Sequence, residues 1–478
     1  MEYESVIGLE VHVQLNTKSK IFCNCSTQFG RTPNTNVCPV CMGLPGVLPV
    51  LNKEVLNKAV MAGLALNCTI ADFSKFDRKQ YFYPDLPKNY QVSQYDLPIC
   101  IKGYVDIKTN SQSKRIGITR VHMEEDAGKL IHSEKPGSDF SLVDYNRTGV
   151  PLIEIVSEPD LSLPEEAVVY LNLLRNRLRY VAVSECNMEE GSLRCDANIS
   201  IRPKGQKELG TKTEVKNMNS FKAVEKALKY EIKRQISAVE KKERIVQETR
   251  LWDSEKEVTI SMRSKEEAHD YRYFPEPDLV PMVIDRQVIE GIKKNMPELP
   301  DLKAERYVKE FGLTHDDAEI ITFEKEMALF YEECVKIHRN YKSVANWLRS
   351  EVMQYLNRNN KAITDMKDLK PANLAKLIKL VDDGIITGKI GKELVIEIIE
   401  KDIDPAVLIE KKGLKQVSDE GAIEKIVDEV IKENPDAVEK FKSGKTGILG
   451  FLVGQVMKKS QGKANPAIVN KLFEQKMK

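Results

Sequence analysis

Apolar and polar residues alternate in the first segment of the chain that has a clear pattern. Between residues 6 and 15, every second side chain is apolar: Ile7, Leu9, Val11, Val13 and Leu15. Because successive side chains of a strand point to opposite faces, this period of two predicts a half-buried strand. The other face of this strand then carries Glu10, His12 and Gln14 in one row.

Two later segments repeat this alternation and add polar side chains to the predicted sheet. Residues 150–158 place Glu154 and Glu158 on one side of a strand. Residues 192–202 alternate an apolar series with a polar one: Ser192, Arg194, Asp196, Asn198 and Ser200. The three segments together predict a sheet with one face of carboxylates, amides and arginines. An ordinary solvated face is the alternative for any one row taken alone.

Helical periodicity dominates the second half of the chain. In the first part of the chain, two helices are predicted. One begins with a capping box at residues 162–165, and the other begins at Ser220. After the Pro-rich stretch 296–300, apolar residues recur three and four positions apart, and the pattern changes again near residues 402–405. We therefore predict an α+β fold in three parts: a β-rich domain 1–295, a helical domain 296–401 and a small helical tail 402–478.

Charge is balanced over the whole chain but not along it. The 478 residues include 73 Lys and Arg against 72 Asp and Glu, a net charge of +1. No whole-chain field attracts nucleic acid or a membrane, so any such affinity is local. Residues 441–478 hold eight lysines and one glutamate, which predicts a basic tail that contacts RNA phosphates. A stabilising cap or a contact with a partner protein is the alternative.

The sequence also indicates a compartment. Its first residues lack the basic start and apolar core of an export signal, and no segment approaches the roughly 18 to 20 apolar residues of a membrane span. Nine cysteines are an odd number in a long chain, which favours reduced thiols over a disulfide framework. A cytoplasmic location is expected.

Four of the cysteines have the spacing of a metal site. Cys23 and Cys25 are separated from Cys38 and Cys41 by twelve residues. Two close pairs joined by a loop can surround one tetrahedral zinc ion, and four thiolates would make the site closed and structural. The alternative is four ordinary reduced thiols, because the first pair is spaced C-x-C instead of the commoner C-x-x-C.

Further carboxylates occur in three short segments: residues 122–126, Glu189 with Glu190, and Glu214. Carboxylates crowded on one sheet face repel one another or bind a cation, and hard oxygen ligands beside an imidazole suit magnesium. Arginines such as Arg147 and Arg194, together with the lysines of residues 77–88, would neutralise phosphates. The pattern favours a site for a nucleotide and magnesium.

Eight segments of the chain match one family of enzymes: residues 6–15, 38–46, 81–90, 122–129, 144–154, 188–198, 271–278 and 454–458. In them the chain closely resembles the B subunit of the glutamine-dependent aspartyl/glutamyl-tRNA(Asn/Gln) amidotransferases. The resemblance runs from the first predicted strand to the basic tail. It implies a β-rich cradle domain, then a helical domain, then a small tail similar to the YqeY family.

The resemblance also implies an activity and partners. It predicts an ATP-dependent ligase subunit that binds Asp-tRNA(Asn) or Glu-tRNA(Gln) and phosphorylates the side-chain carboxylate of the attached amino acid. Ammonia from a partner glutaminase (amidase), the A subunit, then displaces the phosphate, in a heterotrimer completed by a small C subunit. The cofactors implied are ATP and Mg²⁺, with structural Zn²⁺ at the four cysteines.

Site residues follow from the same resemblance. The implied magnesium ligands are Glu10, His12, Glu125 and Glu214. The implied pocket residues are Glu154, Glu190, Arg194, Asp196, Asn146 and Arg147. Lys79 and Lys88 are expected at the wall where ammonia enters. Arg194 and the two lysines have an alternative role as ordinary ion-pair partners.

Two other classes of protein compete with this interpretation. A non-catalytic, zinc-containing adaptor that binds tRNA for an amidase complex would leave the carboxylate-lined strands without a purpose. A hydrolase acting alone would need a Ser-His-Asp or Cys-His arrangement, which the spacing of residues does not support.

Overall fold

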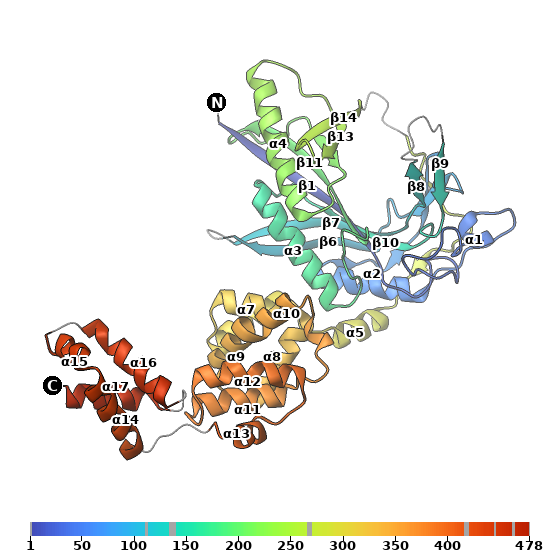
Figure 1. The fold of residues 1–478 in the computed structure, drawn as a ribbon. Coiled ribbons are helices and arrows are strands. Elements are labelled where there is room, and N and C mark those ends of the chain that lie inside the picture. The colour runs from blue at the N-terminus through green and yellow to red at the C-terminus, as the bar shows by residue number, and fades with distance from the viewer. Residues whose placement is uncertain are drawn as a thin grey trace. The chain divides into compact units, whose positions relative to one another are not determined.

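The computed structural model describes residues 2–109, 113–132, 140–264, 270–414, 420–443, 446–460 and 464–477. The chain divides into two compact units, Met1–Leu299 and Pro300–Lys478 (Figure 1). Among the described residues, no helix is both long enough and apolar enough to cross a membrane.

A nine-stranded sheet forms the centre of the first unit, in the order β14-β13-β12-β11-β1-β10-β7-β6-β2 (Figure 1). Its strands are β1 (Tyr3–Gln14), β2 (Thr69–Ile70), β6 (Cys100–Lys108), β7 (Ser113–Glu125), β10 (Pro151–Ser157), β11 (Leu193–Pro203), β12 (Thr213–Lys216), β13 (Glu248–Asp253) and β14 (Val258–Ser264). Neighbours are antiparallel except β12 and β13, which are parallel. The first strand of the chain therefore lies in the middle of the sheet, between β10 and β11.

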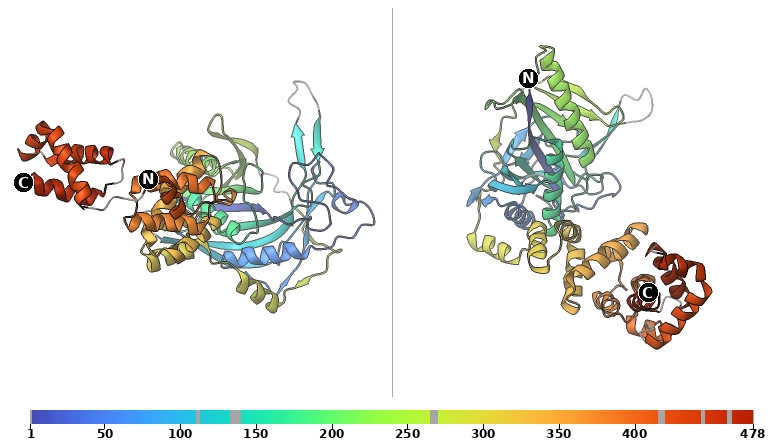
Figure 2. Two further views of the ribbon diagram at one scale, coloured as in Figure 1. Left: turned by 60° about the horizontal axis from the view of Figure 1, so that its bottom comes forward. Right: turned by 90° about the vertical axis from the view of Figure 1, so that its left-hand side faces the viewer.

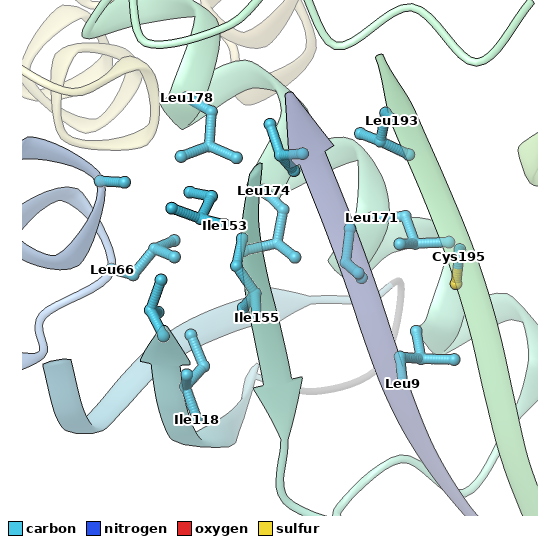
Figure 3. Close-up of a cluster of buried hydrophobic side chains, with 14 of the residues drawn as sticks. Leu9, Leu66, Ile118, Ile153, Ile155, Leu171, Leu174, Leu178, Leu193 and Cys195 are labelled. Atoms are coloured by element: carbon cyan, nitrogen blue, oxygen red, sulfur yellow. The ribbon is translucent and has the colours of Figure 1, made fainter. Parts of the chain in front are cut away.

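One face of the sheet is apolar and covered by helices. They are α2 (Lys53–Ala65), α3 (Pro164–Tyr180) and α4 (Phe221–Glu240) (Figure 1). Leu9, Ile153 and Ile155 point from the strands toward Leu171 and Leu174 of α3 (Figure 3). Burying each such side chain stabilises the fold by about 1.5–3 kcal/mol. The alternation seen in residues 6–15 thus leaves the opposite face for polar groups.

Helix α3 begins one residue later than the sequence predicts. Glu166, not Glu165, accepts hydrogen bonds from the backbone N–H groups of Ser162 and Leu163, at 2.8 and 3.3 Å. Glu166 is buried and also pairs with Lys114 at 2.9 Å, whereas Glu165 pairs with Lys229 of α4 at 2.6 Å. Two adjacent glutamates made the sequence ambiguous, and the buried contact with Lys114 fixes the choice.

Shorter elements surround the sheet. A three-stranded sheet has the order β15-β4-β5, and two pairs are β16-β3 and β8-β9. The hairpin β8–β9, teal in Figure 2, projects from the rest of the unit. The bounds are α1 (Pro39–Met42), β3 (Phe73–Ser74), β4 (Asp77–Gln80), β5 (Tyr90–Ser93), β8 (Lys129–His132), β9 (Ser141–Asp144), β15 (Phe274–Pro275), β16 (Met282–Val283) and α5 (Arg286–Asn295).

The described part of the second unit is built from helices around two hydrophobic clusters. The first cluster is formed from α6 (Pro300–Phe311), α7 (His315–Thr322), α8 (Lys325–Ile337), α9 (Tyr341–Trp347), α10 (Met353–Arg358), α11 (Pro371–Asp382), α12 (Gly388–Glu400) and α13 (Pro405–Lys412). The second is formed from α14 (Glu420–Glu433), α15 (Pro435–Lys442), α16 (Leu449–Lys459) and α17 (Pro466–Lys476). A mixed sheet followed by helices confirms the predicted α+β class.

Lysines of the predicted basic tail take part in ion pairs. Lys459 lies 3.1 Å from Glu429 and 2.6 Å from Glu433, and Lys476 lies 2.7 Å from both Glu424 and Asp428. Lys445, Lys463 and Lys478 lie outside the described residues. Acidic side chains of α14 therefore offset part of the positive charge that the sequence places in residues 441–478.

Candidate active site on the polar face of the sheet

Four ionisable side chains meet at the centre of the polar face. His12 of β1 lies opposite Glu154 of β10, which lies opposite His122 of β7, so the strand register brings them side by side in one row. The Nε2 atom of His12 is 3.5 Å from carboxylate oxygens of both Glu124 and Glu154. The Nε2 atom of His122 is 3.2 Å from Glu154 and 3.8 Å from Glu124.

This row has the geometry of a cation site. His12, Glu124 and Glu154 each offer one ligand atom, and these atoms all lie within 4.8 Å of one another. The two carboxylates are the hard oxygen ligands that magnesium prefers, and the imidazole is a borderline donor that transition-metal ions also bind. The donor set therefore fits a divalent cation.

The histidines and glutamates of this group shift one another's pKa values. Burial alone would lower the pKa of an imidazole, but hydrogen bonds to Glu124 and Glu154 outweigh it and raise the pKa of His122 to about 9. The pKa of His12 is also raised against the effect of burial, by Glu154 and Glu124. Burial opposes ionisation of the two carboxyl groups, yet the imidazoles hold the pKa values of both Glu124 and Glu154 below the usual range.

Glu10 and Glu214 lie on the same face but bind other groups. Asn198 donates a hydrogen bond to Glu10 at 2.8 Å. Lys216 lies 2.6 Å from Asp196 and 3.1 Å from Glu214, and the Thr249 hydroxyl donates to Glu214 at 2.7 Å. These predicted residues form a second polar cluster, across β1, β11 and β12, beside the row around His12.

Glu125 is not brought to His12. It points to the opposite side of β7 from Glu124, because adjacent residues of a strand alternate. There it is buried, pairs with Lys88 and accepts a hydrogen bond from the backbone N–H of Val92 at 2.8 Å. Glu124, which the sequence analysis did not single out, takes the expected place. The period of two that begins at His122 was the signal that could have identified Glu124.

A cavity of about 620 Å³ opens on the polar face of the first unit. The predicted pocket residues Glu190, Arg194, Asp196, Asn146 and Arg147 all line it. Arg194 lies opposite His12 in the register of β11 and β1, so the cavity adjoins the row of ionisable groups. Glu154 belongs to that row and is not among the residues that line the cavity.

Buried Asp126 holds the two arginines of the cavity. Its carboxylate lies 3.0 Å from Arg194 and 3.6 Å from Arg147, and it accepts a hydrogen bond from Gln14 at 2.8 Å. Arg147 also donates to the carbonyl oxygens of Ala127 and Gly128, at 2.9 and 2.6 Å. Arg194 is therefore both an ion-pair partner and a cavity residue, so the two roles given to it by the sequence are compatible.

The two predicted lysines lie in different surroundings. The ammonium nitrogen of Lys79, in β4, lies 4.8 Å from the ring centroid of Tyr271. Burial opposes its charge, but the negative charge of Glu124 leads the effects that raise the pKa of Lys79. Lys88 pairs with Glu125 next to the cysteine group, in a small cavity that Lys20 and Cys41 also line. Lys79 thus interacts electrostatically with Glu124 and Glu154, whereas Lys88 pairs with Glu125.

The four spaced cysteines converge at one point. The sulfur atoms of Cys23, Cys25, Cys38 and Cys41 lie within 4.8 Å of one another, and so can hold one metal ion. A hydrogen bond from the Cys23 thiol lowers the pKa of Cys41 to about 5, against burial and with help from the Cys38 N–H and the ammonium of Lys20. Burial raises the pKa of Cys25 to about 11. Four sulfur donors suit a soft ion such as zinc.

Lys20 is a functional residue that sequence reasoning missed. Its side chain is fully buried, and its ammonium lies 3.7 Å from the sulfur of Cys41 and donates to the carbonyl oxygen of Asn36 at 2.7 Å. A buried ammonium is costly without a partner, so negative charge on the thiolates and this lysine stabilise each other. No pattern in the sequence indicates this burial.

The mixed sheet, the carboxylate and histidine row and the adjoining arginine-lined cavity define the catalytic component of an enzyme. Residues 5–290 match the family described as the GatB/GatE catalytic domain, and residues 329–477 match the GatB domain. The chain therefore belongs to the family of the B subunit of aspartyl/glutamyl-tRNA(Asn/Gln) amidotransferase, as its sequence motifs predict. Its class is that of a ligase that forms a carbon–nitrogen bond.

Full-length relatives support this membership. A protein of Carboxydothermus hydrogenoformans, named as the B subunit of aspartyl/glutamyl-tRNA(Asn/Gln) amidotransferase, is 59% identical over 477 residues, covering 100% of this chain and 99% of the relative. Proteins of the same name from Caldanaerobacter subterraneus and Rippkaea orientalis are 58% and 56% identical. They cover 100% of this chain and, respectively, 100% and 98% of each relative.

Proposed function

We propose that this chain binds Asp-tRNA(Asn) or Glu-tRNA(Gln) and converts the attached side chain to its amide in two steps. In the first, a carboxylate oxygen of the substrate attacks the γ-phosphorus of ATP and ADP leaves. In the second, ammonia attacks the acyl carbon and inorganic phosphate leaves. The carboxylate resists ammonia because it has no good leaving group, and the acyl phosphate supplies one.

One observation carries this proposal: the row of His12, Glu124 and Glu154 adjoins a cavity in which Asp126 fixes two guanidinium groups. Positioned cations stabilise the negative charge that develops on a transferring phosphoryl group. Arg147 and Arg194 are held by carboxylate and carbonyl oxygens, so they are preorganised for this role. A non-catalytic adaptor would have no use for such an arrangement.

Magnesium would be held by His12, Glu124 and Glu154, whose ligand atoms lie close together. When bound, it would supply charge stabilisation for the phosphate oxygens. The geometry supports Glu124 in place of Glu125 in this role. Glu10 and Glu214 stay predictions as ligands. Glu214 pairs with Lys216, and Glu10 accepts a hydrogen bond from Asn198.

Zinc would be held by the four cysteines as a closed structural site. The soft donors and their close approach support this assignment, and Lys20 offsets part of the charge of four thiolates. Such a site leaves no open position for a reacting group. Zinc would therefore stabilise the fold of residues 20–41 without taking part in the reaction.

The partners proposed are a glutaminase (the A subunit), a small C subunit and the aminoacyl-tRNA, in the cytoplasm. An ammonia entrance at Lys79 is supported by the charge of Glu124, which raises the pKa of Lys79, and by the ring of Tyr271, 4.8 Å from its ammonium. Lys88 stays a prediction for that wall, because its ammonium pairs with Glu125.

The proposed function is tested with free ammonia. The purified complex should amidate mischarged tRNA with ammonium chloride as the nitrogen source, and consume ATP in proportion to amide formed. It should transfer the γ-phosphate of ATP to the aminoacyl group when ammonia is left out. Amidation without ATP consumption would rule out activation by phosphorylation. Failure to amidate from free ammonia while glutamine hydrolysis proceeds would overturn the proposed activity.

Deleting residues 415–478 tests the proposed RNA contact of the tail. The cut leaves Leu408 and Ile409 of α13 in the hydrophobic cluster that they complete, and removes the whole cluster of α14 to α17. The KM for aminoacyl-tRNA should rise about tenfold, and its salt dependence should flatten because fewer counterions are released. Glutaminase activity should stay. An unchanged KM across a salt series would assign the tail another role.

A further inference from the structure

The twelve residues between the two cysteine pairs form one wall of the cavity. Residues 27–31 and Pro33 line it. The converging sulfur atoms of Cys25 and Cys38 hold the two ends of this loop, residues 26–37, close together. The zinc ion proposed for the four cysteines would keep the base of this loop closed and so present its tip in one position.

Hydrogen bonds attach residues 32–36 of the loop to β9 and the residues that follow it. The N–H groups of Asn34 and Asn36 donate to the side chains of Asp144 and Asn146, at 3.0 and 2.7 Å. Asn146 in turn donates to the carbonyl oxygen of Thr32 at 2.7 Å. The loop is thus fixed to the end of β9, next to Arg147 of the cavity.

Phe29 is the exposed tip of this fixed loop. Its side chain is 72% exposed although it lines the cavity. Gly30 follows with φ of +76°, a left-handed conformation that favours glycine and turns the chain at this point. A large aromatic ring held in water by a rigid loop has no folding role, which points to a ligand that covers it.

The charged residues near Phe29 indicate which kind of ligand covers it. Arg31 lies two residues further along the same wall, and Lys129 and Arg147 also line the cavity. The acidic lining residues Glu189, Glu190 and Asp196 belong to other segments than this loop. On this wall the carboxylate of Asp144 is already occupied by the N–H groups of Asn34 and Asn146. An apolar protein side chain would gain nothing from these cations, whereas a nucleotide combines a flat π-system with negative phosphates.

We propose that Phe29, flanked by Arg31, is a stacking platform for a nucleobase at the mouth of the cavity. The inference rests on the proposed function, which supplies two nucleobases: the adenine of ATP and the unpaired base at the aminoacylated end of the tRNA. Both offer the same π-face, and a stacked base contributes an affinity that sequence-independent binding requires.

The test uses the complete complex with two fluorescent probes. One is the triphosphate of 2-aminopurine riboside in place of ATP, and the other is a tRNA with 2-aminopurine at its 3′ end. The fluorescence of this base is quenched when it stacks. Phe29→Ala should weaken binding of one probe about tenfold and relieve its quenching. Phe29→Tyr should bind normally, while Phe29→Leu, apolar without a π-face, should behave as Phe29→Ala.

Leu48→Ala is the matched control, because Leu48 is an equally exposed apolar side chain, at 70%, outside the cavity lining. It should leave both probes unaffected. The probe that responds to Phe29→Ala identifies the nucleobase. Unchanged binding of both probes, equal rescue by Leu and Tyr, or loss of a partner protein with normal probe binding would each overturn the platform.

Failure of the stacking platform can be distinguished from failure of the proposed function. If the wild-type complex binds and quenches a probe but forms no amide, the proposed function fails and the platform stands. If amidation proceeds normally in Phe29→Ala with unchanged probe binding, the platform fails alone. Melting temperature and metal content of each variant report whether the loop is still folded.

Discussion

Glu124→Gln is expected to lower the rate of ATP-dependent amidation at least about a hundredfold, while the partner continues to hydrolyse glutamine. The substitution keeps the shape of the side chain and removes one negative charge from the row of His12, Glu124 and Glu154. A weaker ligand set holds magnesium less well and stabilises less of the charge on the transferred phosphoryl group. The concentration of Mg²⁺ needed for half-maximal rate should therefore rise together with the loss of rate.

Glu125→Gln is the matched comparison, because the same change is made one residue further on, on the opposite side of β7. It disturbs the pair with Lys88 and the hydrogen bond from Val92. We expect it to affect stability, with a normal requirement for Mg²⁺. The reverse outcome, a raised Mg²⁺ requirement in Glu125→Gln and a normal one in Glu124→Gln, would locate the cation on the other face of the sheet.

Cys41→Ser is expected to remove the bound metal and to lower the free energy of unfolding of the first unit by several kcal/mol. Cys41 is the buried member of the four, and binding free energy at a structural zinc site is also folding free energy. Elemental analysis should fall from one zinc ion per chain toward none, and the melting temperature should drop with it.

Cys68→Ala serves as the control for the loss of a thiol. Cys68 is buried in the core of the same unit, away from the four-cysteine group. It should retain zinc and lose only the modest stability of a small core truncation. A Cys41→Ser protein that keeps its zinc and melts normally would exclude the metal site, as would a wild-type protein that contains none.

The sequence predicted the two faces of the sheet because alternation is a local property. Ile7, Leu9 and Val11 are buried and Glu10 and His12 face the other way, as a period of two requires. The convergence of four cysteines was equally readable, since two close pairs have few other arrangements. The α+β class followed from the change of period along the chain.

The alignment of the strands was not predicted from the sequence, and neither was the choice between adjacent glutamates. That His12 faces Glu154 and His122 depends on how β1, β10 and β7 align, and sequence spacing does not determine alignment. The predicted and observed residues differ at two places, and each has two adjacent glutamates: Glu124 and Glu125 in β7, and Glu165 and Glu166 at the start of α3. In β7 both glutamates are buried, on opposite sides, and the period of two from His122 decides which one joins His12. At α3, the pair with Lys114 accompanies the burial of Glu166.

The position of β1 has a consequence for synthesis of the protein. Residues 3–14 lie between β10 and β11, so β1 has no partner until β10 is complete at residue 157, and its second partner is complete only at residue 203. At typical rates of translation, this strand waits for its neighbours for on the order of ten seconds. During that interval its apolar side chains and both of its hydrogen-bonding edges are open, which exposes the nascent chain to wrong pairing. We expect ribosome-associated chaperones to be most important for this protein before residue 203 emerges.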